Sequence, residues 1–216
     1  MASKLTTEDY VEAVQYILKN RKQRKFAETI DLQIGLKDYD PKKDKRFSGT
    51  IKLPNVTRPN IKLCIIGDVK HCEEAQEAGI DFKSEEDLKK FKKDKKLIKK
   101  WAKQYDLLLV TDTLSRKVPK ICGPILNKIN MFPQVVTKKE PLKNKIAEIK
   151  CSVKFQLKKV ICMQVPIGKD TLTEDEIRTN LTMSVNFLVS LLKKGWNNVK
   201  SLHVKTTMGK TKKLYG

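Results

Sequence analysis

The segment TIDLQIGL, residues 29–36, alternates between polar and apolar side chains. A period of two predicts a strand with one buried and one exposed face, as in antiparallel or mixed sheets. The same alternation recurs far along the chain, in 151–157 and 201–207. Two lysines follow the first of these segments, and we expect them to turn the chain into 160–165 as a β-hairpin.

The middle of the chain has a different pattern. Residues 61–68, IKLCIIGD, and 105–112, YDLLLVTD, each contain a nearly continuous apolar run. Such runs are typical of strands buried on both faces, as in parallel sheets flanked by helices. Helical segments are predicted after each strand, and one of them ends at Gly79. This succession of strands and helices predicts a small three-layer α/β unit.

Amphipathic helices are predicted near both chain ends, and the capping box of Thr173 with Glu176 begins the stronger one. Both ends therefore combine helices with alternating strands. We predict two domains of α+β and α/β class. A split α+β domain, residues 1–57 and 148–216, is interrupted by an inserted α/β domain, residues 58–147. Insertion is tolerated where exposed chain ends lie close together.

The net charge of the chain limits the classes of partner that it can bind. Its 216 residues include 46 Lys and Arg against 25 Asp and Glu, a net charge of +21. A field of this sign attracts polyanions, with nucleic acid first and an anionic membrane surface second. The longest apolar runs, Leu63–Ile66 and Leu107–Val110, are far shorter than the roughly 20 residues of a spanning helix. We expect a soluble intracellular protein that binds a polyanion, with no membrane and no small-molecule substrate.

Few residue patterns point to catalysis. The sequence has no HExxH motif, no nucleophile elbow and no GxGxxG after either apolar strand. Five cysteines without a CxxC pair, together with two histidines, give no metal-ligand spacing. We predict no enzyme, no cofactor and no metal site, and expect the cysteines to be free thiols.

Gly209-Lys210-Thr211 matches the second half of a P-loop, but Val204 occupies the position of the first glycine in that motif. Only five residues follow Thr211, too few for the helix that would hold a phosphate at its N-terminus. The segment that begins at Thr206 closes a strand with hydroxyls, a flexible thioether and a glycine. These groups suit contact with folded RNA by shape.

A lysine run occupies residues 89–103. On one continuous helix these lysines wrap most of the circumference and leave Ile98 and Trp101 among the residues that reach the core. The run is as consistent with a solvated helix face that adds general positive potential as with an RNA-binding stripe, so its role stays open. Its lysines are Lys89, Lys90, Lys92, Lys93, Lys95, Lys96, Lys99, Lys100 and Lys103.

Four segments taken together resemble the ribosomal L-one family of the large subunit's mobile stalk. The N-terminus, MASKLTTEDYVEAV, is similar to the eukaryotic cytosolic branch of that family, called L-ten-a. The resemblance covers essentially the whole chain. It implies a split α+β RNA-binding domain, formed by both chain ends, with an inserted Rossmann-like three-layer α/β/α domain. The segments are RKFAETIDL (24–32), FSGTIKLP (47–54), VPIGK (165–169) and VKTTMGK (204–210).

The resemblance implies a non-enzymatic structural protein of the large ribosomal subunit. Its partners would be the stalk region of large-subunit ribosomal RNA near the tRNA exit site, the exit-site tRNA and other ribosomal components. The protein would help to release deacylated tRNA during translation. Its location would be the cytosolic ribosome in the cytoplasm, with nuclear and nucleolar transit during assembly.

The RNA face implied by the resemblance combines residues from both ends of the chain. Lys169, which follows a Pro-Ile-Gly turn, is a further candidate contact, and Arg24, Lys25 and Lys210 would add charge around it. Taken by itself, Phe26 is equally compatible with a core position. The residues matching the family's RNA face are Phe26, Glu28, Thr29, Ser201, Thr207, Met208 and Gly209.

Two other functions are alternatives to this one. A ribosome-biogenesis factor with the same RNA-binding domain is the alternative, although such proteins usually add long charged extensions, which this sequence lacks. A nucleotide-dependent enzyme built on the inserted domain is disfavoured by the missing glycine motif.

Overall fold

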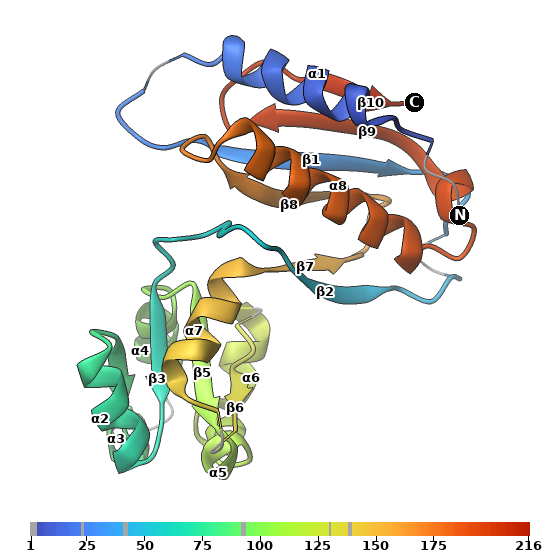
Figure 1. Cartoon of the computed structure of the whole chain (residues 1–216). Coiled ribbons are helices and arrows are strands. Elements are labelled where there is room, and N and C mark those ends of the chain that lie inside the picture. Colours follow the sequence, from blue (N-terminus) through green and yellow to red (C-terminus); the bar gives the residue numbers. More distant parts are fainter. Residues whose placement is uncertain (1–3, 23, 41–42, 92–93, 130, 138–139) are drawn as a thin grey trace. The chain divides into compact units, whose positions relative to one another are not determined.

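The computed structural model describes all residues except 1–3, 23, 41–42, 92–93, 130 and 138–139. The chain forms two compact units, a split unit of Met1–Pro59 with Ile149–Gly216 and an inserted unit of Asn60–Glu148. The split unit holds antiparallel strands and the inserted unit a parallel sheet (Figure 1). The predicted fold class is therefore confirmed, while the RNA-binding role of the split unit stays a prediction.

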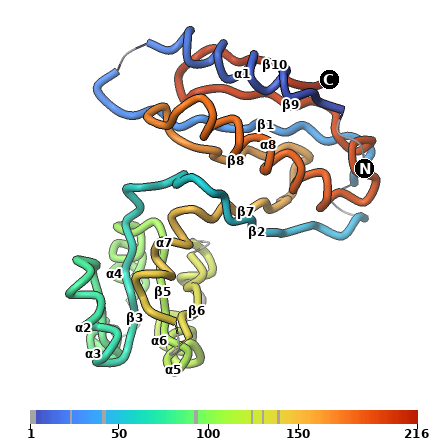
Figure 2. The backbone as a smooth tube through the Cα atoms, viewed as in Figure 1, coloured from blue at the N-terminus to red at the C-terminus, as the bar shows by residue number. Residues whose placement is uncertain are grey.

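The main sheet of the split unit is antiparallel, with the order β10-β9-β1-β8. Its central strand β1 (Thr29–Leu36) pairs with β8 (Cys162–Lys169) on one side and β9 (Val199–Thr206) on the other. Figure 2 shows how the first and last parts of the chain interleave in this sheet. The edge strand β10 (Lys212–Tyr215) was not predicted, because its two leading lysines hide the alternation.

The predicted hairpin between 151–157 and 160–165 is wrong. Instead, β7 (Ser152–Gln156) pairs with β2 (Ser48–Lys52) in a separate two-stranded sheet, while β8 pairs with β1. The connection from β7 to β8 contains no glycine or asparagine, the residues that tight hairpin turns need at positive φ. The connection therefore does not impose a hairpin, and each strand pairs with a distant partner.

Two helices cover one face of the main sheet, α1 (Thr7–Lys19) and α8 (Glu174–Leu191) (Figure 1). Both begin with capping boxes, and the one at Thr173 was predicted. The 3₁₀ helix η1 (Gly195–Asn198) then leads from α8 into β9. The apolar residues of β1 and β9 lie buried together with the apolar face of α8. The opposite face of the sheet carries the polar residues of the alternating strands.

The inserted unit contains a parallel sheet in the order β4-β3-β5-β6. All four residues of β3 are buried, as the continuous apolar run predicted. Helices lie on both faces, with α7 in front of the sheet and α4 and α6 behind it in Figure 1. No helix within the described ranges is long and apolar enough to span a bilayer. The strands are β3 (Leu63–Ile66), β4 (Asp81–Lys83), β5 (Leu107–Thr111) and β6 (Gln134–Val136). The helices are α2 (Val69–Glu77), α3 (Glu85–Lys90), α4 (Lys95–Ala102), α5 (Asp112–Ser115), α6 (Val118–Ile129) and α7 (Leu142–Cys151).

The lysine run does not form the single helix that was expected. It is divided between α3 and α4, and α4 begins after Asp94, whose carboxylate accepts a hydrogen bond from the Lys96 amide at 2.8 Å. A side chain that caps amides in this way starts a new helix. Ile98 and Trp101 are buried, as predicted. Lys92 and Lys93 lie outside the described residues.

Candidate RNA-binding surface

Thr29 and Thr207 join the first residue of β1 to the end of β9. The Thr207 amide donates to the Thr29 carbonyl oxygen at 2.9 Å, and the Thr29 amide donates to the Thr207 hydroxyl oxygen at 3.1 Å. The same hydroxyl donates to the Thr29 carbonyl oxygen at 3.2 Å. A hydroxyl has two acceptor lone pairs. Thr207 therefore fixes this corner of the sheet and keeps one lone pair for a ligand.

Glu28 holds three chain segments together just before β1. Its side chain is only 4% exposed and accepts hydrogen bonds from Arg24 Nε at 2.6 Å and from the Met208 amide at 3.4 Å. Its backbone oxygen accepts from the Asp170 amide at 3.0 Å. The neighbouring Thr206 hydroxyl, the Met208 amide and Arg24 hold the pKa of Glu28 below its usual range, against the effect of burial. The carboxylate thus organises the loops that surround it.

Two large apolar side chains are exposed on those loops. Phe26 is 53% exposed and Met208 is 61% exposed. The core alternative for Phe26 is therefore wrong. Burying such side chains stabilises a complex because apolar surface leaves water. Since Glu28 binds the Met208 amide and lies two residues from Phe26, both side chains belong to the same end of the sheet.

Gly209 closes the turn that displays Met208. Its amide donates to the Thr206 carbonyl oxygen at 3.3 Å. A Cβ atom at this position would collide with the Thr206 hydroxyl oxygen. Glycine is therefore required here by close packing, and the bare backbone of the turn stays accessible to a ligand.

The predicted Pro-Ile-Gly turn is wrong, because these residues continue strand β8 as far as Lys169. Lys169 lies at the same end of the sheet, because it pairs directly with Thr29 of β1. Arg24, Lys25 and Lys210 are exposed on the adjoining loops. The structure thus places most of the predicted contact residues around one end of β1. Positive side chains there surround the apolar and hydroxyl groups described above.

Ser201 does not belong to this end of the sheet. It pairs with Gly35, and at about 3.3 Å per residue it lies roughly 20 Å along β9 from Thr207. The two residues are an even number of positions apart, so both face away from the helices. They mark the two ends of one polar sheet surface, which we call the open face.

The open face contains residues that sequence reasoning missed. A shallow groove of about 490 Å³ on it is lined in part by Gln33, Gln164 and His203. Gln164 donates to the Asp31 carboxylate at 2.7 Å, while burial raises the pKa of Asp31. The signal that could have identified them is the polar half of each alternating strand. These side chains add hydrogen-bonding groups between the two ends of the face.

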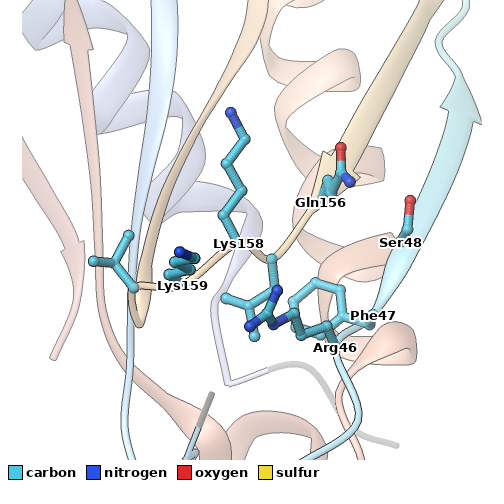
Figure 3. Close-up of a pocket in the computed structure, with 8 residues that line it drawn as sticks. Arg46, Phe47, Ser48, Gln156, Lys158 and Lys159 are labelled. Atoms are coloured by element: carbon cyan, nitrogen blue, oxygen red, sulfur yellow. The ribbon is translucent and has the colours of Figure 1, made fainter. Parts of the chain in front are cut away.

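A second missed feature is a basic pocket of about 630 Å³ beside the two-stranded sheet (Figure 3). Arg46 and Phe47 line it from the segment that enters β2, and Lys158 and Lys159 line it from the segment that leaves β7. Both lysines were predicted to form a hairpin turn, so the sequence did not suggest that they line a charged pocket. The positive side chains of this pocket can attract a phosphate.

Two of the cysteines are buried and unreactive. Burial raises the pKa of Cys64 to about 12 and that of Cys122 to about 11, so neither thiol ionises near neutral pH. All five cysteines are free. Within the described part of the chain, no group of three His, Cys, Asp or Glu residues is placed to hold a metal ion.

Comparison with known proteins places these features in a family context. Residues 18–210 match the ribosomal protein L1p/L10e family. The chain is 52% identical over 215 residues to the large ribosomal subunit protein uL1 of Caenorhabditis elegans, covering 99% of this chain and all of that protein. It is 49% identical over 217 residues to the uL1 of Drosophila melanogaster, with both chains covered completely. It is also 50% identical to the uL1 of Oryza sativa subsp. japonica, across 99% of this chain and all of that one.

Proposed function

The chain belongs to the ribosomal protein L1p/L10e family, and we propose that its split unit binds the stalk region of large-subunit ribosomal RNA near the tRNA exit site. The protein is a structural, non-enzymatic component of the large ribosomal subunit, with ribosomal RNA and ribosomal proteins as partners. In this role it would help to release deacylated tRNA. It would act on the cytosolic ribosome after nuclear and nucleolar assembly.

One observation carries this proposal. Exposed Phe26 and Met208 are held beside one buried carboxylate, Glu28, at the end of a polar sheet face. Large exposed apolar side chains inside a basic surface suit RNA, whose unpaired bases and sugars are themselves partly apolar. A site for a free nucleotide would instead enclose its ligand in a cavity.

The residues divide into those that touch RNA and those that hold the site in place. Met208 and Phe26 would pack against bases or sugars, while Thr207 and the backbone at Gly209 would contact 2′-hydroxyls or phosphates. Lys169, with neighbouring basic residues, would supply charge that weakens with salt. Glu28 is a positioning residue, since its carboxylate is directed at the protein's own groups.

The test compares two exposed methionines of the split unit. Met208→Asp places a negative charge against the RNA backbone, so we expect affinity for a stalk RNA fragment to fall at least about 100-fold. Met183→Asp is the matched control, because Met183 is 38% exposed on α8, the helix that covers the other side of the sheet. The control should change affinity less than about threefold. Equal affinity of Met208→Asp and wild type in a filter-binding titration would refute the site.

Sedimentation tests the cellular part of the proposal. The protein should stay with mature 80S particles after a high-salt wash, as expected of a structural subunit component. Confinement to nucleolar pre-ribosomes would instead support a biogenesis factor with the same RNA-binding domain.

A further inference from the structure

Helix α4 presents five lysines on one side. At 100° per residue, these lysines fall within an arc of about 140°, and Ile98, Trp101 and Ala102 occupy the buried side. We call this arc the α4 lysine face. Its residues, all exposed, are Lys95, Lys96, Lys99, Lys100 and Lys103.

In the described part of the inserted unit, the α4 lysine face groups five lysines without an acidic partner, in contrast to Lys89, Lys90 and Lys117 of the same unit, which form ion pairs. Lys89 pairs with Glu85 at 2.9 Å, and Lys117 pairs with the same carboxylate at 2.9 Å. Lys90 pairs with Asp87 at 2.8 Å. Among the residues that the structure describes, no ion pair involves a lysine of the α4 face. The face therefore projects its full positive charge into solvent.

This arrangement works against the helix that carries it. Helices α1, α3 and α8 all have acidic residues in the first turn, where they complement the helix dipole. Helices α2, α6 and α7 have none there, and α4 carries Lys95 and Lys96 directly after its capping residue Asp94. Its lysines also repeat at i and i+4, a spacing at which like charges repel. Lys99 and Lys100 lie in the last turn, where positive charge suits the dipole, so the cost comes from the lysines of the first turn and from repulsion between neighbours. Such a cost points to a function outside the helix.

We propose that the α4 lysine face binds the phosphate backbone of double-stranded RNA. The lysines span about 12 Å along the helix axis, a length that carries roughly seven phosphates in a nucleic-acid duplex. No large apolar side chain lies within the arc, and the half-exposed Leu97 lies outside it. Helices that bind membranes or proteins use apolar anchors beside the charge, so charge alone favours a phosphate backbone. This contact goes beyond the proposed function, because it uses the inserted unit and none of the site residues of the split unit.

Two triple variants of the full chain test the proposal with the same change in net charge. Lys95→Gln, Lys99→Gln and Lys103→Gln neutralise the α4 lysine face. The matched control neutralises the paired lysines 89, 90 and 117 of the same unit. The probe is a mixed-sequence RNA duplex of about 20 base pairs, titrated at several salt concentrations.

We expect the α4 variant to lose at least about 10-fold in duplex affinity, and the slope of log K against log salt to shrink by about two to three. The control should lose less than about twofold. Equal losses of affinity in the two variants would show that only the net charge of the protein matters, and would overturn the proposal. Loss of polyglutamate binding with unchanged duplex binding would also overturn it and identify an acidic protein as the partner.

A thermal melt excludes damage to the fold. Because the α4 lysines repel one another, the α4 variant should melt at the same temperature as wild type or higher. A lower melting temperature would contradict the argument that these lysines cost stability. Stalk RNA binding in the Met208→Asp variant reports on the split unit, so failure of either proposal leaves the other standing.

Discussion

The split unit and the inserted unit are both basic, but they organise their charge differently. The split unit contains 26 Lys and Arg against 12 Asp and Glu, and the inserted unit contains 20 against 13. At the candidate site of the split unit, a buried Glu28 holds exposed apolar side chains and hydroxyls in fixed positions. The α4 lysine face of the inserted unit holds charge alone. Specific recognition requires fixed geometry, whereas general attraction to RNA requires only unneutralised charge.

The largest effect is expected from a substitution in the core of the inserted unit, which tests whether the two units unfold independently. Trp101 is 7% exposed and packs against Phe91 and Tyr105 at ring-centroid distances of 5.7 and 6.0 Å. Trp101→Ala should lower the unfolding free energy of the inserted unit by about 3–5 kcal/mol. The remaining Trp196 is buried in the split unit and reports its unfolding by fluorescence. The Trp196 transition in urea should stay in place while circular dichroism gains an earlier one. A shift of both transitions would contradict independent units.

Glu28→Ala tests the same independence by destabilising the split unit. The substitution leaves Arg24 and the Met208 amide without their buried acceptor, so the split unit should lose about 2–3 kcal/mol of unfolding free energy. The Trp196 fluorescence transition should move to lower urea, and affinity for the stalk RNA fragment should fall with it. Glu28→Gln, which keeps the shape, should lose less. Unchanged RNA affinity in the alanine variant would remove Glu28 as a positioning residue.

A pair of Gly→Ala changes contrasts the two units at smaller scale. At Gly209, a Cβ would collide with the Thr206 hydroxyl, so RNA affinity should fall about 10-fold, or about 1.4 kcal/mol. At Gly123, on α6 of the inserted unit, nothing lies within 4 Å of the added atom. The change there should stabilise the helix by about 0.5–1 kcal/mol and leave RNA binding alone. If Gly209→Ala and Gly123→Ala bound RNA with equal affinity, the turn at Gly209 would not need its exact geometry for RNA binding.

The smallest expected effect is on pH dependence. Because the folded pKa of Glu28 is lowered, its contribution to stability is complete above the unfolded value of 4.5 and is lost as pH falls through the folded value. Asp31 acts with opposite sign, since burial raises its pKa and its contribution declines as pH rises past 3.8. Urea titrations should show the split unit weakening below about pH 4.5. Glu28→Gln should flatten this slope, and an unchanged slope would contradict the assigned role.

Local periodicity was enough to predict most of the architecture. The alternation in 29–36 and the apolar run at Leu63–Ile66 gave the correct strand types, because burial on one or two faces leaves a direct mark on the sequence. The partners of β7 and β8 were not predictable, since pairing between distant segments depends on tertiary packing. The break between α3 and α4 was not predicted, because the capping residue Asp94 is surrounded by lysines and does not stand out in the sequence.

The sequence suggested which residues form the candidate site, but it did not indicate which of them are buried and which are exposed. The family resemblance implied that Glu28, Thr207 and Met208 belong together, and the structure shows the carboxylate buried and the thioether exposed. The separation of Ser201 from that cluster follows from strand register, which short motifs do not encode. The position of Lys158 in the basic pocket was not predicted, because a pair of lysines between two strands is also compatible with a turn.

The most direct test of the central claim is ultraviolet crosslinking of the full chain within purified ribosomes, followed by identification of both the crosslinked peptide and the RNA fragment. The account predicts crosslinks from the peptides containing Phe26 and Met208 to the stalk region of large-subunit ribosomal RNA. Crosslinks to this RNA confined to the inserted unit, with those two peptides unmodified, would contradict it.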